Sequence, residues 1–154
     1  MEILRFHKVL PFGSIPDEEL TYSVIAARYR GRWVCVRLKG RKDWCFPGGG
    51  RENGESMEEN ACRELFEETG ALDYEMYPLG IYGVNHLVRT PGEERHERYS
   101  WGGLYAGEIH HFTAIPKEFE IAERRYFKEF PLDNARFPDI MPGMMDWLNE
   151  NMEL

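Results

Sequence analysis

The stretch that decides the fold is residues 44–71, WCFPGGGRENGESMEENACRELFEETGA. Its short aromatic run ends at a proline and three glycines, which predicts a strand followed by a loop with unusual backbone angles. A helix should follow over residues 57–69. Ser56 is a good N-cap, Glu59 completes a capping box three residues on, and Gly70 stands where a left-handed C-cap residue belongs.

Three carboxylates lie on one stripe of this predicted helix. Glu64, Glu67 and Glu68 fall at i, i+3 and i+4, beside an apolar arc that contains Leu65. Like charges at this spacing repel one another, and a divalent cation would neutralise them. Several hard oxygen ligands suit Mg²⁺ or Mn²⁺. An acidic stripe is also typical of a solvated helix face, so these glutamates alone do not decide between the two interpretations.

Further residues around the stripe occur at the spacing of a known signature. Gly49, five residues, Glu55, seven residues and then the run 63–71, RELFEETGA, resemble the Nudix box of the Nudix hydrolases. Seven fixed residue types at fixed spacing would arise by chance on the order of 10⁻⁸ per starting position, taking about 7% usage for each. Residues 44–49 resemble the family's lead-in strand. Ala71, where the family usually has a larger aliphatic residue, is a departure that concerns packing.

The resemblance implies both a fold and a reaction. The fold is an α/β (α+β) sandwich, with a mixed central sheet and the Nudix loop-helix-loop, as a single domain over residues 1–154. The reaction is Mg²⁺-dependent hydrolysis of a pyrophosphate bond in a nucleoside diphosphate joined to another group, by water attack on phosphorus. Mn²⁺ is a possible substitute ion. A bound metal would explain how an acidic site accepts an anion, because it reverses the local sign of the charge.

Carried over residue by residue, the resemblance also implies roles. Glu64, Glu67 and Glu68 are implied as metal ligands, with Glu64 and Glu67 the candidates for the base that activates water. Arg63 is implied as the catalytic partner that orients a glutamate through a charge-assisted hydrogen bond. Glu123, in the later run 120–127, is implied as a further metal ligand.

The glycines and the glutamate of the loop are assigned to substrate binding. Gly48, Gly49 and Gly50 would let the backbone pass close to the helix and the metal, although one or two of them could equally serve the turn alone. Glu55 could either assist the metal site or hold the loop.

The substrate is less constrained than the reaction. The chain's size and layout resemble MutT-like enzymes, which favours a nucleoside triphosphate such as 8-oxo-dGTP. Dinucleotide polyphosphates, nucleotide sugars and RNA 5′ ends are further candidates, as is a nucleotide-sensing Nudix module without catalysis. Such a module would be free to lose the glutamates, and all three are present. Four aromatic residues are candidates to stack a base, although core packing is the commoner fate of such residues: Tyr82, Trp101, Tyr105 and Phe127.

Outside the box, strands dominate the expected structure. Residues 21–39 and the pair 79–89 with 99–112 are predicted to form hairpins. Residues 125–130 are expected to add a strand, and residues 144–152 have the apolar spacing of an amphipathic helix.

Composition limits the partners and the compartment. The chain has 154 residues and a net charge of -8, which disfavours non-specific binding to duplex nucleic acid. No apolar run is long enough to span a membrane, and Arg5, His7 and Lys8 interrupt the apolar N-terminus, so a cytoplasmic protein is expected. Three cysteines without a CxxC pair are expected to be reduced and buried. The expected assembly is a monomer or homodimer.

Overall fold

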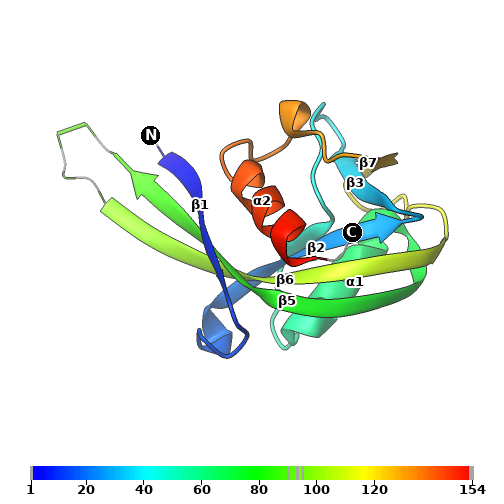
Figure 1. Cartoon of the computed structure of the whole chain (residues 1–154), viewed down its shortest axis with the longest axis horizontal. Helices are drawn as coiled ribbons and strands as arrows, with labels where there is room; N and C mark the ends of the chain where they lie inside the picture. The colour runs from blue at the N-terminus through cyan, green and yellow to red at the C-terminus, as the bar shows by residue number, and fades with distance from the viewer. Residues whose placement is uncertain (1, 90, 93, 95, 153–154) are drawn as a thin grey trace.

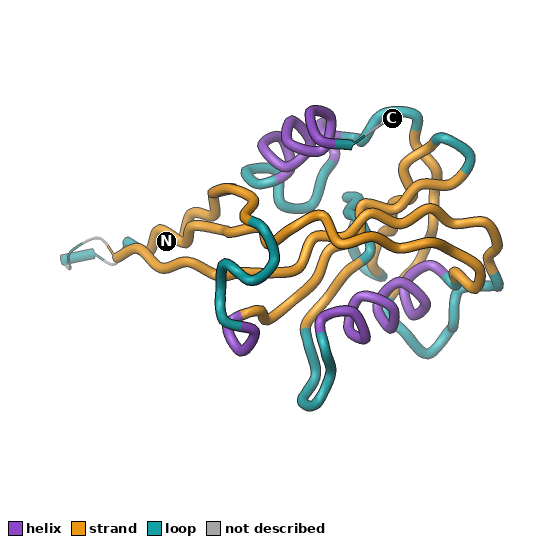
Figure 2. The backbone as a smooth tube through the Cα atoms, turned by 60° about the horizontal axis from the view of Figure 1, so that its bottom comes forward, coloured by secondary structure: helices purple, strands orange, loops and turns teal. Residues whose placement is uncertain are grey.

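Two helices pack on opposite faces of one mixed sheet (Figures 1 and 2). The computed structural model describes residues 2–89, 91–92, 94 and 96–152. The strands are β1 (Glu2–Leu10), β2 (Leu20–Tyr29), β3 (Arg32–Leu38), β4 (Gly48–Gly50), β5 (Ala71–Val88), β6 (His96–Phe112) and β7 (Ile121–Phe127). The α-helices are α1 (Met57–Thr69) and α2 (Met141–Asn151), and single 3-10 turns cover Asp17–Glu19 and Leu132–Asn134.

The sheet combines both kinds of strand pairing. The strand order is β1-β5-β6-β2-β3-β7, and β4 pairs with β2 off this path. Strands β2 and β6 run parallel, whereas neighbours such as β5 with β6 and β3 with β7 are antiparallel. The predicted mixed sheet between helices is therefore confirmed.

Local sequence signals predicted the central elements well. Strands β2 and β3 form the expected hairpin, and Arg30 and Gly31 in its turn have φ of 50° and 78°. Helix α1 has the predicted bounds, with the Ser56 capping box formed and Gly70 left-handed at φ 77°. The pair β5 and β6 forms the second hairpin, although β5 starts earlier, at Ala71, because its first residues pair with the end of β6.

The structure differs from the expected elements in several details. Gly48–Gly50 form strand β4 against β2 and are not among the glycines with positive φ, so the expected loop of unusual backbone angles is absent there. Residues 44 and 45 make only isolated bridges instead of a strand. Strand β1 was not predicted, because it is formed by pairing with β5, whose residues are far away in the chain.

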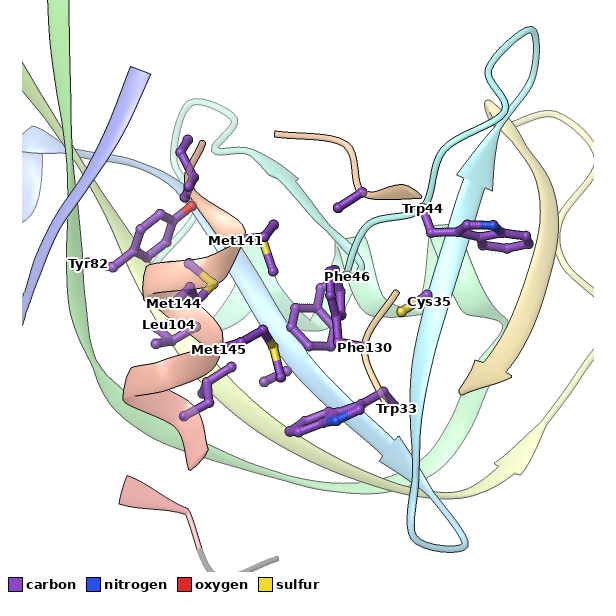
Figure 3. Packing of buried hydrophobic residues seen from close by; sticks show 14 of the residues in the cluster. Trp33, Cys35, Trp44, Phe46, Tyr82, Leu104, Phe130, Met141, Met144 and Met145 are labelled. Carbon is purple, nitrogen blue, oxygen red and sulfur yellow. The ribbon is translucent and has the colours of Figure 1, made fainter. Parts of the chain in front are cut away.

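The core has two layers, one under each helix. Leu65 and Ala61 of α1 are fully buried against the sheet face that carries Ile25. On the other face, Met144 and Leu148 of α2 belong to a cluster rich in methionine and aromatic side chains (Figure 3). Among the described residues, no helix is both long enough and apolar enough to cross a membrane.

Candidate active site

Burial of its apolar arc decides which way helix α1 turns its acidic stripe. Because Leu65 packs into the core, Glu64 and Glu68 are turned toward strand β4. The Nδ2 group of Asn60 donates a 2.9 Å hydrogen bond to the carbonyl of Gly50, which ties the helix to the strand. The predicted helix and the predicted glycines are thus brought into direct contact.

Glu68 is a half-buried residue whose carboxylate is held by the backbone of β4. The amide N–H of Gly48 donates to Oε1 of Glu68 at 2.7 Å. Burial is the main cause that raises the pKa of Glu68 to about 8, and the neighbouring charge of Glu64 raises it further against the opposing effect of the Gly48 bond. A cation at this carboxylate would remove the cost of its charge.

Glu64 lies in the space that a side chain at position 49 would fill. A Cβ atom at Gly49 would be 2.6 Å from Oε1 of Glu64, so only glycine leaves room for this carboxylate. A Cβ at Gly48 would collide with the carbonyl oxygen of Ser23, whereas one at Gly50 would meet nothing within 4 Å. Glycine is therefore required at position 48 for the close approach of β4 to β2, and at position 49 for the close approach of β4 to Glu64. Neither approach requires glycine at position 50.

Arg63 links the loop to the acidic stripe. Its Nε and Nη2 donate to the two carboxylate oxygens of Glu55 at 2.6 and 3.0 Å. Its Nη1 donates to Glu64 and to Glu67, each at 3.1 Å. The charge-assisted bond from Arg63 lowers the pKa of Glu55 to about 2, and the Glu52 backbone N–H also donates to that carboxylate. The contacts of Glu55 are those of a residue that holds the loop and Arg63.

The carboxylates of Glu64, Glu67 and Glu68 are suitable ligands for a hard divalent cation, although their oxygens do not already converge on one metal position. Among the described residues, no three His, Cys, Asp or Glu side chains have the arrangement of a metal-ligand group. Arg63 lies between Glu64 and Glu67 and contacts both. The room that Gly49 leaves for the Glu64 carboxylate and the raised pKa of Glu68 are nevertheless what a bound cation would explain, since oxygen donors suit Mg²⁺.

Glu123 makes its contacts with other residues than the glutamates of α1. It is on β7, where its carboxylate is bound by Arg125 at 2.7 Å and by Arg37 at 3.4 Å. These two arginines lower the pKa of Glu123. The structure therefore brings Glu64, Glu67, Arg63 and Glu55 together with the glycines, but it does not bring Glu123 to them.

A cavity of about 340 Å³ opens beside Glu68, on the α2 side of the sheet. Its lining includes Gly48–Gly50, Tyr22, Tyr82, Arg136 and Phe137. Its aromatic and aliphatic walls suit a planar organic group, while Glu68 borders it with a carboxylate.

Of the four aromatic residues proposed to stack a base, Tyr82 lines this cavity. Trp101 and Tyr105 pack in the core layer under α1, and Phe127 contacts the ring of Trp44 edge to face. Sequence reasoning did not select Tyr22, which lies in a hairpin strand without any motif.

Comparison with known proteins identifies the family to which this chain belongs. The sequence profile of the NUDIX domain matches residues 19–148. The chain belongs to the Nudix family. It is 31% identical to an RNA pyrophosphohydrolase from Erythrobacter litoralis over 122 residues, which are 71% of this chain and 73% of that protein. A protein of the same name from Shewanella oneidensis is 47% identical over 47 residues, 30% of this chain and 26% of that one.

Solved Nudix structures share the fold. The Bacillus subtilis pyrophosphohydrolase BsRppH (E68A mutant) superposes with a TM-score of 0.66 at 22% identity, covering 96% of this chain and 90% of that one. A MutT NUDIX hydrolase from Burkholderia pseudomallei has a TM-score of 0.54 at 22% identity, covering 86% and 96%. This Nudix protein is accordingly a hydrolase that acts on pyrophosphate bonds, as the Nudix box implied.

Proposed function

We propose that this Nudix hydrolase splits the pyrophosphate bond of a nucleotide 5′-polyphosphate, and that its preferred substrate is the triphosphate at the 5′ end of RNA. The observation that carries the reaction is the half-buried Glu68 carboxylate, held by Gly48 at the border of a cavity lined by aromatic side chains. A relative that matches over 71% of this chain and 73% of its own is named an RNA pyrophosphohydrolase, which supports the RNA end over dinucleotide polyphosphates and nucleotide sugars.

Each residue of the site has a proposed part. Glu64 and Glu68 would hold Mg²⁺, with Mn²⁺ as a substitute. Glu67 would join them once Arg63 moves away from its carboxylate. When bound, the ion would neutralise phosphate charge and lower the pKa of a water molecule. Arg63 positions Glu64 and Glu67 through its hydrogen bonds, and Glu55 positions Arg63.

The remaining assignments follow from the same contacts. Glu64 and Glu67 stay the candidates for the base. Gly48, Gly49 and Gly50 border the cavity, in which the substrate's phosphates would lie. The proposed metal site does not use Glu123, because the contacts of its carboxylate among the described residues are with Arg37 and Arg125 and not with Arg63, which joins Glu64 and Glu67.

A free nucleoside triphosphate is the second candidate, with 8-oxo-dGTP as its example. The net charge of -8 favours this small substrate over a polyanion, since a long RNA would be repelled by most of the surface. An RNA substrate would therefore be engaged mainly through its first nucleotides.

One panel separates these candidates. The protein is incubated with Mg²⁺ in ¹⁸O-labelled water, with one substrate in each reaction. The substrates are a short RNA carrying a 5′-triphosphate, the four nucleoside triphosphates, 8-oxo-dGTP, a dinucleotide polyphosphate and a nucleotide sugar. We expect the largest kcat/KM for the RNA, with loss of activity in EDTA. Glu68→Gln should abolish turnover, and Glu58→Gln, on the exposed first turn of the same helix, is the matched control. Stabilisation by ligands without turnover of any of them would refute the enzyme and favour a sensor.

A further inference from the structure

A chain of hydrogen bonds crosses the sheet on the wall of the cavity. Tyr22 Oη lies 2.9 Å from Ser100 Oγ, and the ring of Tyr82 packs against that of Tyr22. Ser100 Oγ is 2.7 Å from His86 Nε2, and His86 Nδ1 is 2.7 Å from Oε1 of Glu2. Tyr22, Tyr82, His86 and Ser100 all line the cavity that Glu68 and the glycines border.

The chemistry of its outer end gives this chain one direction. An ionised carboxylate only accepts hydrogen bonds, and the bonds from His86 lower the pKa of Glu2, so Nδ1 of the imidazole must carry the hydrogen. In a neutral ring, Nε2 is then an acceptor for the Ser100 hydroxyl. Ser100 must in turn accept from Tyr22.

The consequence is that every hydroxyl hydrogen of the chain is already committed. Tyr22 Oη donates to Ser100 Oγ, which donates in turn to His86 Nε2, so both oxygens can only accept a further hydrogen bond. These two oxygens therefore bond only a substrate group that carries a donor. In a nucleobase, those donors are the amino and imino N–H groups.

The position of the chain suits the part of a substrate beyond the phosphates. Gly48 holds Glu68 on β4, while Tyr22 is on β2, Ser100 on β6 and His86 on β5. Adjacent strands lie about 4.8 Å apart, so β4 and β6 are separated by about 10 Å across β2. A nucleotide with phosphates at Glu68 would extend its base toward Ser100.

The local backbone is shaped for this wall. A Cβ atom at Gly102, which is paired with Tyr22 across β2 and β6, would collide with the Tyr22 ring. The tyrosine therefore lies flat over β6 with its hydroxyl at Ser100. The rings of Tyr22 and Tyr82 are 5.3 Å apart, and the pair forms an apolar side of the same wall.

We infer that Tyr22 and Ser100 are specificity-determining residues that select a nucleobase presenting an amino or imino N–H to the cavity. This inference rests on the proposed function for the identity of the substrate, but the selection itself is a property of binding. A nucleobase analogue that lacks the N–H leaves the two oxygens unpaired and binds less tightly.

The test uses pairs of nucleoside triphosphates that differ by one amino group: ATP with purine riboside triphosphate, and GTP with inosine triphosphate. Kinetics and calorimetric binding are both measured with Mg²⁺ at pH 8.5, where an ordinary imidazole is neutral. For at least one pair we expect the deamino member to have about tenfold higher KM and Kd with similar kcat, since one hydrogen bond is lost in ground state and transition state alike.

The variants separate recognition from structure. Tyr22→Phe removes one acceptor, and Ser100→Ala also frees the Tyr22 hydroxyl to donate into the cavity, so in both the ratio within that pair should fall toward one. Tyr77→Phe, which removes a phenol bonded to Glu75 on the exposed part of β5, is the control and should keep the ratio. Discrimination that persists in both cavity variants, or is absent from the wild type in both assays, would overturn the inference. Discriminating binding without turnover would instead refute the proposed function alone.

Discussion

Glu68→Gln should stabilise the metal-free protein while it removes the activity. Glu68 is half-buried, and the partial loss of water around its carboxylate raises its pKa from the ordinary 4.5 to about 8. Since the folded-state pKa lies above the unfolded one, the stability linked to this group is complete below pH 4.5 and is lost as pH rises through 8. At about 1.36 kcal/mol per pH unit, the loss is about 3 kcal/mol at pH 7 and about 5 kcal/mol well above pH 8.

Glutamine avoids this loss because it stays neutral, and its amide oxygen can still accept from the Gly48 N–H. Thermal unfolding in EDTA should therefore give nearly equal melting temperatures for variant and wild type at pH 4.5. At pH 7 the variant should melt roughly 6 to 12 °C higher, taking about 2 to 4 °C per kcal/mol for a chain of this size. Added Mg²⁺ should raise the wild-type melting temperature more than that of the variant, because binding to the folded state stabilises it.

Glu58→Gln is the control, since it makes the same substitution on the same helix at an exposed position. Melting curves of Glu68→Gln and wild type that run parallel from pH 4.5 to 8 would show that Glu68 is not a group with a raised pKa.

Three other substitutions test the packing around the site. Gly49→Ala should displace the Glu64 carboxylate and lower kcat/KM by about 10- to 100-fold. Gly50→Ala, whose added Cβ has no atom within 4 Å, should have nearly wild-type kcat/KM. Equal activities of the two variants would contradict the close approach of Gly49 to Glu64. Arg63→Lys should lower activity by a similar factor, because lysine cannot hold Glu55 with two parallel bonds, and titration of activity against Mg²⁺ would detect it. Leu65→Ala should cost about 2 to 5 kcal/mol of unfolding free energy in urea, and an unchanged midpoint would disprove its burial.

Local signals were enough to predict the helix and its acidic stripe. The bounds of α1 follow from the Ser56 cap and the Gly70 C-cap, both of which act over a few residues. The direction of the stripe follows from helical periodicity, because the residues that must be buried are on the adjoining arc. The first hairpin was predictable for the same reason, since Gly31 determines its turn.

The partners of those residues were not local. Strand β1 was missed because its pairing with β5 joins residues far apart in the chain. The glycines were expected to form a loop because a run of three glycines suggests turns, yet tertiary pairing with β2 extends them. Glu55 could not be placed from sequence, since its role depends on where Arg63 points.

By itself, the order of residues determined that a short helix carries Glu64, Glu67 and Glu68 in one stripe, because caps and periodicity are properties of neighbouring residues. Only the tertiary structure decided that Glu68 accepts a hydrogen bond from Gly48 and that Tyr22 contacts Ser100. Those contacts join strands and a helix that the chain connects through long intervals, and they exist because the sheet packs its two faces under two different helices.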